Sequence, residues 1–263
     1  MFDVDFKDII KQGYVEKLKL KDKEFFKRVF EGGIEKYEKR IKKLGFVGKE
    51  TSVLDVGCGF GQWSLAFAKY NASVCGIEYQ MDRFNAFSKI INDYKINNIE
   101  VVLGDIEDTR LYQNFQKFDY VFCYGVIFLT NWRKTLKNLI NVTKKGGYIY
   151  ICANDVGWYY HLIKEEPNKV SGYNPMEHGI SAFVNEYRYE KLGEEFSGDR
   201  ILRLQTLLDE LKRHRECSLA VYSYEGGISK EDAKYVMGVD MSFFKGEYCG
   251  LRGVYEVIIQ KNK

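Results

Sequence analysis

The sequence predicts an α/β protein with a doubly wound, mostly parallel sheet, helices before the sheet and an insertion after its fifth strand. Short apolar runs alternate with helical patterns over residues 52–153, which is typical of parallel strands joined by helices. A run of three glycines, Gly57, Gly59 and Gly61, follows the first apolar run, where a strand would turn into a helix. Right-handed crossovers would bring all such turns to one edge of the sheet.

Residues 1–50, before the first strand, are expected to form a helical segment that packs on the core. Apolar residues recur at helical spacing in two stretches on either side of Gly32 and Gly33. The lysine-rich faces of these helices are interpreted as solvated surface. Basic residues exceed acidic ones by only 40 − 37 = 3 in the whole chain, so a nucleic-acid partner is not expected.

The glycine turn is the part of the sequence that says most about chemistry. Glycine lets the backbone turn sharply and approach a ligand, and the helix that follows offers free amide groups at its start. The spacing Asp55-x-Gly57-x-Gly59-x-Gly61 differs from the G-x-G-x-x-G spacing of a dinucleotide site. A carboxylate at Asp55 would repel a pyrophosphate and would favour a ligand with an ammonium or sulfonium charge.

This turn resembles the first motif of the class I S-adenosylmethionine-dependent methyltransferases, and four later segments resemble further motifs of that family in the expected order, over residues 53–152. The resemblance implies a seven-stranded sheet of order 3-2-1-4-5-7-6. It also implies S-adenosyl-L-methionine as cofactor and S-adenosyl-L-homocysteine as product. The residues it assigns to cofactor binding are Asp55, Gly57, Cys58, Gly59, Gly61, Glu78, Tyr79, Asp105, Ile106 and Tyr124.

The resemblance gives some of these positions a specific role. Glu78 ends a second apolar run, 78 − 57 = 21 residues after the first glycine, and would bind both ribose hydroxyls. Asp105 would accept a hydrogen bond from the adenine amino group, with Ile106 packed on the ring. Cys123 lies at the fourth strand end, which would face the transferred methyl, and is interpreted as a small buried residue. Tyr14 is a candidate to cover the cofactor from the leading helices.

After the fifth strand the pattern breaks, and residues 155–198 are expected to form a substrate-binding insertion or lid. The segment has no clean period, yet its aromatic content argues against disorder. His178 and His161 are candidate general bases, with Asp155 as the next candidate, although each histidine could equally be a packing residue. The aromatic side chains that could stack on an acceptor are Trp158, Tyr159, Tyr160 and Tyr173.

The sheet would be completed by residues 199–263, after a cofactor-binding core over residues 51–154. Leucine spacing predicts an amphipathic helix over residues 199–215, and residues 253–260 fit the last strand. Two segments qualify for the strand paired with it. Residues 218–224 are favoured over residues 241–248.

Two missing motifs narrow the choice of acceptor. A D/N-P-P-F/Y element is absent from the fourth strand end, which argues against methylation of an amide or an adenine amino group. Neither proline precedes a cysteine, which argues against methylation at cytosine C5. The sequence therefore predicts O-methylation of a small polar molecule with a hydroxyl, such as a sugar or sugar-nucleotide precursor. An N-methyltransferase of a small amine or RNA, and a non-catalytic cofactor-binding protein, stay open as alternatives.

The remaining composition predicts an ordinary cytoplasmic enzyme. Six cysteines without a C-x-x-C pair are interpreted as small apolar residues in a reducing compartment. Apolar stretches of 18 residues are absent, and the N-terminus is too charged for a signal peptide, so no membrane partner is expected. Metal-ligand spacing is not visible, and the oligomeric state is not predicted.

Overall fold

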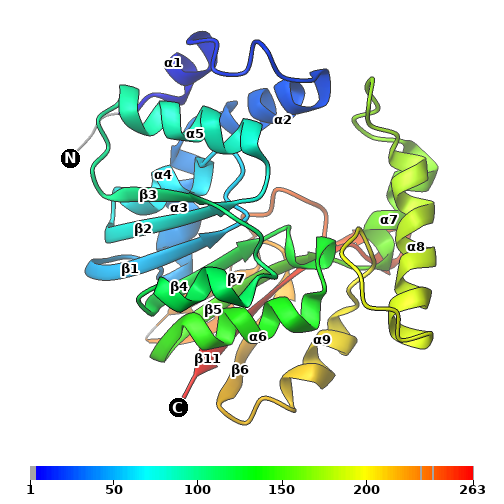
Figure 1. Ribbon diagram of the computed structural model, residues 1–263. Helices are drawn as coiled ribbons and strands as arrows, with labels where there is room; N and C mark the ends of the chain where they lie inside the picture. The colour runs from blue at the N-terminus through cyan, green and yellow to red at the C-terminus, as the bar shows by residue number, and fades with distance from the viewer. Residues whose placement is uncertain (1–3, 232, 239, 263) are drawn as a thin grey trace.

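A seven-stranded sheet forms the centre of the computed structural model, which describes residues 4–231, 233–238 and 240–262 (Figure 1). The strand order is β3-β2-β1-β4-β5-β11-β6; β11 runs antiparallel to β5 and β6, and the other neighbouring pairs are parallel. Because β6 and β11 are the sixth and seventh strands of this sheet, the expected order 3-2-1-4-5-7-6 is confirmed. The strands are β1 Gly48–Val56, β2 Asn71–Glu78, β3 Ile99–Leu103, β4 Phe118–Tyr124, β5 Thr143–Asn154, β6 Cys217–Tyr224 and β11 Val254–Lys261.

Helices pack on both faces of the sheet. Neighbouring residues of a strand point to opposite faces, so Val53 belongs to one apolar core and Leu54 to the other. The first core is closed by α1 Phe6–Lys11, α2 Leu20–Phe30, α3 Glu35–Leu44, α4 Gln62–Ala68 and α5 Met81–Asp93. The second is closed by η1 Thr109–Asn114, η2 Ile127–Leu129, α6 Trp132–Val142, α7 Val156–Glu165, α8 Pro175–Lys191 and α9 Leu204–Leu211.

The N-terminal helices pack on the first apolar core, and two details of this segment bear on the site. The segment ends earlier than residue 50, because Gly45 caps α3 in the left-handed region and β1 already begins at Gly48. Tyr14 does not cover the glycine turn. Its hydroxyl donates instead to Asp93, with 2.9 Å between the oxygens, at the far end of α5.

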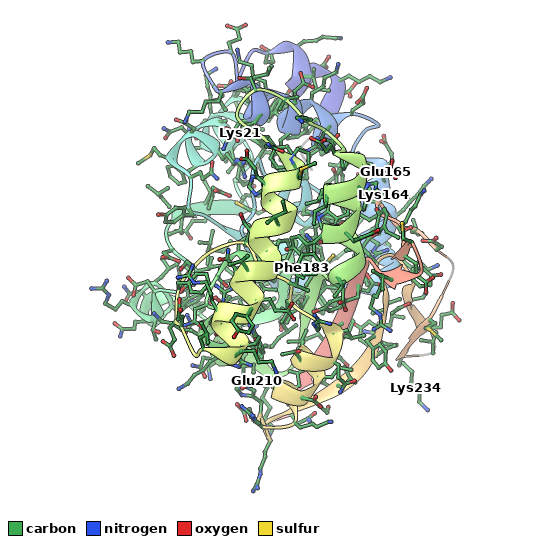
Figure 2. The ribbon with its side chains drawn as sticks, turned by 90° about the vertical axis from the view of Figure 1, so that its right-hand side faces the viewer. Lys21, Lys164, Glu165, Phe183, Glu210 and Lys234 are labelled. Atoms are coloured by element: carbon green, nitrogen blue, oxygen red, sulfur yellow. The ribbon has the colours of Figure 1, made fainter. Side chains whose placement is uncertain are left out.

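The insertion forms a helical hairpin of α7 and α8 beside the carboxyl ends of the strands (Figure 1), although its sequence has no clean period. The face that α8 buries carries small residues, among them Gly179 and Ala182, whereas Ile180 and Val184 are exposed. The most hydrophobic face of this helix is therefore not the face that is buried. Figure 2 views the hairpin from outside, with Phe183 labelled between the two helices.

Helix α9 is shorter than the predicted range of residues 199–215, because the strap, residues 196–203, is extended before it. Gly198 donates its amide to the carbonyl of Leu129 (2.9 Å), and Leu202 donates to that of Asn154 (3.3 Å). Both acceptors follow or end a strand of the sheet. These bonds keep the strap out of the helix and tie it to the carboxyl ends of β4 and β5.

The chain leaves the sheet between β6 and β11 and forms two small hairpins there. They are made of β7 Ile228–Glu231 with β8 Lys234–Met237, and of β9 Glu247–Tyr248 with β10 Leu251–Arg252. Segment 241–248 lies in this excursion, so the favoured segment 218–224 is confirmed as the strand paired with the last one. None of the helices in the described parts of the chain has the length and apolar character needed to cross a bilayer.

Candidate active site

The glycine turn, residues 57–61, joins β1 to α4 at the carboxyl edge of the sheet. Gly57 and Gly61 have φ of +71° and +86°, a region that other residues rarely adopt. A Cβ at Gly57 would lie 2.5 Å from a Val126 methyl, and one at Gly61 would lie 2.0 Å from the Phe87 ring. Glycine is therefore required at both positions by conformation and by space.

Asp55 places a buried carboxylate directly beneath the turn. Its Oδ2 accepts a hydrogen bond from the Ser64 hydroxyl at 2.6 Å, and the residue is 2% exposed. Burial raises the pKa of Asp55 to about 7; the bond from Ser64 opposes this rise, and the charge of Glu78 adds to it. A cationic ligand at this edge would favour the ionised carboxylate.

Glu78, at the end of β2, binds the glycine turn from the side. One carboxylate oxygen accepts from the Gly59 amide at 2.9 Å, and the other accepts from the Gln80 amide at 2.7 Å. Burial raises the pKa of Glu78, while bonds from backbone amides and the charge of Arg83 lower it. The acid and the turn thus form one hydrogen-bonded unit.

The predicted adenine-side residues follow the neighbouring strands β2 and β3, which end side by side because Glu78 pairs with Leu103. Asp105 is exposed and accepts from the Glu107 amide at 2.9 Å, and Ile106 next to it is buried. Tyr79 is 72% exposed. The structure therefore brings Tyr79 and Asp105 to the same edge as Glu78, with free surface on both.

Helix α2 covers the glycine turn through Phe25. A Cβ at Gly59 would lie 3.7 Å from the Phe25 ring. An ion pair between Asp22 and Arg83, with 2.7 Å between the charged atoms, ties α2 to α5, and the Arg83 guanidinium lies 4.9 Å from the Phe25 ring centre. Phe25 thus occupies the position that the sequence suggested for Tyr14.

The end of β4 faces the turn and borders free space. The hydroxyl of Tyr124 donates to a carboxylate oxygen of Glu225 at 3.2 Å. Gly125 follows with φ of +71°, and no atom lies within 4 Å of the position that its Cβ would take. Cys123 is fully buried, as expected, and burial raises its pKa to about 12, which suits a packing residue better than a nucleophile.

His178 lies near the start of α8, beside the strap. Its Nδ1 is 3.5 Å from a carboxylate oxygen of Asp199, and the other oxygen of that carboxylate accepts from the Tyr159 hydroxyl at 2.7 Å. The Tyr173 ring lies 4.9 Å from the imidazole. Because the imidazole is 46% exposed, it remains open to a substrate.

The other two candidate bases have different surroundings. His161 of α7 stacks on Tyr248 with 4.3 Å between ring centres, and burial lowers the pKa of this histidine. Asp155 is buried, and its two oxygens accept from the amides of Val156 (2.7 Å) and Leu204 (3.0 Å). Asp155 thus caps α7 and fixes the start of α9, which leaves it poorly placed to take a proton.

A family model described as a methyltransferase domain matches residues 48–206, more than half of the 263 residues. The chain belongs to this methyltransferase family. The family and the fold together make it a class I S-adenosylmethionine-dependent methyltransferase, so the expected enzyme class and cofactor are confirmed.

Two curated relatives of this methyltransferase are named for different acceptors. A probable cobalt-precorrin-6B C(15)-methyltransferase of Methanococcus maripaludis is 32% identical over 52% of this chain and 71% of its own length. A demethylmenaquinone methyltransferase of Listeria welshimeri is 27% identical over 43% of this chain, and the match spans about half (49%) of that relative.

Solved structures confirm the fold alone, because their sequence identities are low. A methyltransferase from Clostridium acetobutylicum has a TM-score of 0.57 at 13% identity, with 87% of this chain and 92% of that chain covered. The PKMT2 protein of Rickettsia typhi, solved with AdoHcy, has a TM-score of 0.53 at 17% identity, with 87% and 54% covered.

The residues at the glycine turn fit S-adenosylmethionine. Besides the carboxylates of Asp55 and Glu78, the methyltransferase has a buried side-chain oxygen on Gln62 that lacks a hydrogen-bond partner and lies beside Gly59. Buried acceptors need donors, and the cofactor carries amine and hydroxyl donors. Sequence reasoning missed Gln62, although its place directly after the turn was a usable signal. In the described part of the chain, no group of three or more His, Cys, Asp or Glu side chains could hold a metal ion.

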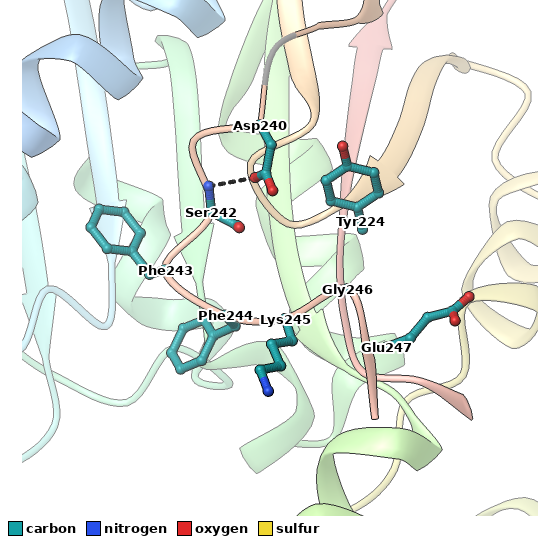
Figure 3. A pocket seen from close by; sticks show the side chains of 8 residues that line it. All are labelled: Tyr224, Asp240, Ser242, Phe243, Phe244, Lys245, Gly246 and Glu247. Carbon is teal, nitrogen blue, oxygen red and sulfur yellow. Dashed lines mark hydrogen bonds between the residues drawn. The ribbon is translucent and has the colours of Figure 1, made fainter. Parts of the chain in front are cut away.

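Sequence reasoning also missed the 240–246 loop, which follows β8 and reaches the carboxyl edge of the sheet (Figure 3). Phe243 contacts the rings of Trp63 and Tyr124, with 5.8 and 6.4 Å between centres, and Phe244 contacts Trp158 at 5.3 Å. The adjacent aromatic pair was the only local signal. A pocket of about 580 Å³ opens along the loop, lined by Tyr224, Asp240, Ser242, Phe243, Phe244, Lys245, Gly246 and Glu247.

Proposed function

We propose that this methyltransferase methylates a hydroxyl group of a small molecule and that His178 is the general base. The observation that carries the proposal is the Asp199 carboxylate, 3.5 Å from Nδ1 of His178. A carboxylate beside one imidazole nitrogen favours the tautomer with its proton there, so Nε2 is free to accept a proton. An alcohol needs such a base, because its own pKa lies far above neutral pH.

Ring contacts and the charge of Arg28 relate His178 to the glycine turn. Arg28 lies 5.6 Å from the ring centre of Phe25, which covers Gly59. The charge of Arg28 also acts on Tyr173, whose ring contacts His178. Figure 1 shows the loop between α7 and α8 extending toward α2. These relations support a position of His178 at the same edge of the sheet as the glycine turn.

The chain has to align the acceptor and take up one proton. S-adenosylmethionine, when bound, supplies a methyl group on a positively charged sulfur that leaves as a neutral thioether. Asp55, Glu78 and Gln62 would hold the cofactor, and the free space beside Gly125 would receive the acceptor. Nε2 of His178 would take the hydroxyl proton as the oxygen gains the methyl group. Alignment can contribute about 7–11 kcal/mol, whereas a general base contributes about 10²–10⁴-fold.

The surroundings of the edge support a small acceptor in a reducing compartment. Helix α2, the α7–α8 hairpin and the 240–246 loop approach it from three directions (Figure 1). A sugar, a sugar-nucleotide precursor or another small alcohol is therefore favoured over RNA. The free cysteines, of which Cys58, Cys75, Cys123 and Cys152 are buried, support a cytoplasmic location.

The experiment uses cofactor with a ¹³C-labelled methyl group and a panel of small alcohols, phenols and amines. Carbon NMR of the product distinguishes methyl on oxygen from methyl on nitrogen or carbon. We expect methyl on oxygen. We also expect His178→Ala to lower kcat about 10²–10⁴-fold with the S-adenosylhomocysteine Kd unchanged. His161→Ala is the matched control. Product methylated on carbon or nitrogen, or wild-type turnover of His178→Ala, would contradict the proposal.

A further inference from the structure

Glu225 is a fully buried carboxylate just after β6 that joins three parts of the fold. One of its oxygens accepts from the Tyr124 hydroxyl at 3.2 Å and lies 3.4 Å from a guanidinium nitrogen of Arg40 in α3. The other accepts from the backbone amides of Phe243 and Phe244, at 2.7 and 3.3 Å. Glu225 thus binds the end of β4, helix α3 and the 240–246 loop.

The loop is anchored at its ends as well as at its centre. The Met241 amide donates to the carbonyl of Gly226 at 3.1 Å, and the carbonyl of Gly246 accepts from the Gly253 amide at 2.8 Å. A Cβ on Gly226 would lie 2.2 Å from the backbone nitrogen of Ser242, so the turn after Glu225 and the loop are in close contact. Of these anchors, Glu225 alone contacts the two phenylalanines.

The fixed loop places two aromatic side chains over the carboxyl ends of β4 and β5. Phe243 is 37% exposed, and its ring partners are Tyr37, Trp63 and Tyr124. Phe244 contacts the Trp158 ring of the α7–α8 hairpin. Such a wall suits a flat apolar ring, because ring faces stack on it and displace water. The faces of the two rings offer no hydrogen-bond partners to the hydroxyls of a sugar, although polar residues such as Asp240 and Lys245 also line the loop pocket.

We propose that Glu225 is a positioning residue that holds Phe243 and Phe244 as a wall for an acceptor with a planar aromatic ring, such as a phenol. This inference rests on the proposed function for the hydroxyl group, and it replaces the sugar expected from the sequence by a ring. Glu225 acts through the loop and does not touch the acceptor.

The test uses the full chain loaded with S-adenosylhomocysteine, and calorimetry with 2-naphthol and with methyl α-glucoside as probes. We expect the wild-type protein to bind 2-naphthol at least tenfold more tightly than the glucoside. Glu225→Ala should weaken the binding of 2-naphthol at least tenfold and speed hydrogen exchange in residues 240–246 at least tenfold. The Kd for S-adenosylhomocysteine should stay within threefold of the wild-type value. Glu225→Gln keeps an oxygen for the loop amides. It should therefore restore most of the 2-naphthol affinity and most of the protection from hydrogen exchange.

Two further variants keep the outcome interpretable where Glu225→Ala fails to fold. Gly226→Ala displaces the loop without changing a charge and should reproduce the loss of 2-naphthol binding. Tyr222→Ala removes an exposed ring on β6 and should leave 2-naphthol binding and hydrogen exchange in residues 240–246 unchanged. If the wild-type protein bound the glucoside more tightly than 2-naphthol, the proposal of a ring acceptor would be overturned. If hydrogen exchange in residues 240–246 were unchanged in Glu225→Ala, the positioning role of Glu225 would be overturned. Methyl transfer to carbon or nitrogen, in contrast, would overturn only the proposed hydroxyl chemistry.

Discussion

Asp55 shows how a single residue can trade stability for ligand binding. Its pKa of about 7 in the folded protein lies above the usual value near 3.8, because the carboxylate is buried. The stabilisation that comes from the protonated form is therefore complete below about pH 4 and is lost as the pH rises through 7. At pH 8 the ligand-free protein carries a buried negative charge that a cationic cofactor would offset.

Asp55→Asn tests this trade. An asparagine can still accept the Ser64 hydrogen bond, but it has no charge to bury. We expect the Tm of the ligand-free variant to exceed that of the wild type at pH 8, and this advantage to shrink at pH 5. The affinity for S-adenosylmethionine should fall at least tenfold at pH 8, measured by calorimetry. A difference in Tm that does not depend on pH would contradict the assignment.

Glu78→Ala should weaken cofactor binding without unfolding the sheet. Hydrogen bonds to a charged group contribute about 1.5–3 kcal/mol, which corresponds to about a 10- to 150-fold rise in Kd. The variant also loses the acceptor of the Gly59 amide, so Glu78→Gln, which keeps a side-chain oxygen there, separates the two effects. Glu100→Ala, an exposed acid on the neighbouring strand, is the control. Unchanged affinity of Glu78→Ala would exclude the ribose role.

Local spacing explains which site residues could be predicted. Asp55, the three glycines and Glu78 lie close together because a strand, a turn and a helix fix their positions within 78 − 55 = 23 residues. Asp199 and Glu225 could not be found in this way. No repeat or motif marks their pairing with His178 and Tyr124, and Tyr124 is 225 − 124 = 101 residues from Glu225.

Among the elements, the α7–α8 hairpin depends on close helix packing at Gly179. A Cβ there would lie 2.6 Å from Ile163 and 2.9 Å from the carbonyl oxygen of Tyr159. Hydropathy alone could not predict this helix pair, because α8 buries the small residues Gly179 and Ala182 at its contact with α7 and exposes Ile180 and Val184. Because His178 is next to Gly179, the position of this proposed general base depends on the spacing between the helices.

Gly179→Ala should therefore affect catalysis as well as stability. Forcing an extra methyl group into a packed interface costs about 1–3 kcal/mol. We expect a lower Tm and a lower kcat, with the S-adenosylhomocysteine Kd unchanged, because the glycine turn lies in a different element. Ser181→Ala, on the exposed side of α8, is the control for Tm and turnover. A variant with lower kcat but the wild-type Tm would show that packing is not the cause.

Across the whole molecule, Arg40 connects the N-terminal helices to the end of the chain. Its fully buried guanidinium forms ion pairs with Glu225 and Glu256 and donates to the Tyr150 hydroxyl at 3.2 Å. Burial raises the pKa of Glu225 to about 7, and the charge of Arg40 opposes this rise. Removing the guanidinium would leave two buried carboxylates without a cation.

Arg40→Met should destabilise the fold by about 3–5 kcal/mol at pH 8, the usual effect of breaking a buried ion pair. The loss should be smaller at pH 5, because protonation removes the charge of Glu225. Urea unfolding at both pH values measures the difference. Lys89→Met breaks an exposed pair with Asp93 and should cost at most about 1 kcal/mol. Equal losses for the two variants would contradict the role of Arg40.

The order of the sheet followed from the family motifs, but the excursion between β6 and β11 did not. Residues 225–253 contain charged and aromatic residues without a strong period, and their two hairpins have strands of two to four residues. Such short strands are stabilised by the surfaces they cover and not by their own sequence. The part of the chain that we propose for the acceptor side therefore could not be predicted from the sequence.

The place of β11 between β5 and β6 sets an order of events during synthesis. Residues 48–124, which carry the glycine turn and the acids around it, leave the ribosome early and pair with close neighbours. The strand at residues 254–261 is synthesised last of those described. In the folded sheet it pairs with β5 on one side and β6 on the other. The excursion that follows Glu225 joins β6 to this strand, so its final position depends on the pairing of β11. The residues of the glycine turn are thus synthesised well before the residues that we propose for the acceptor side.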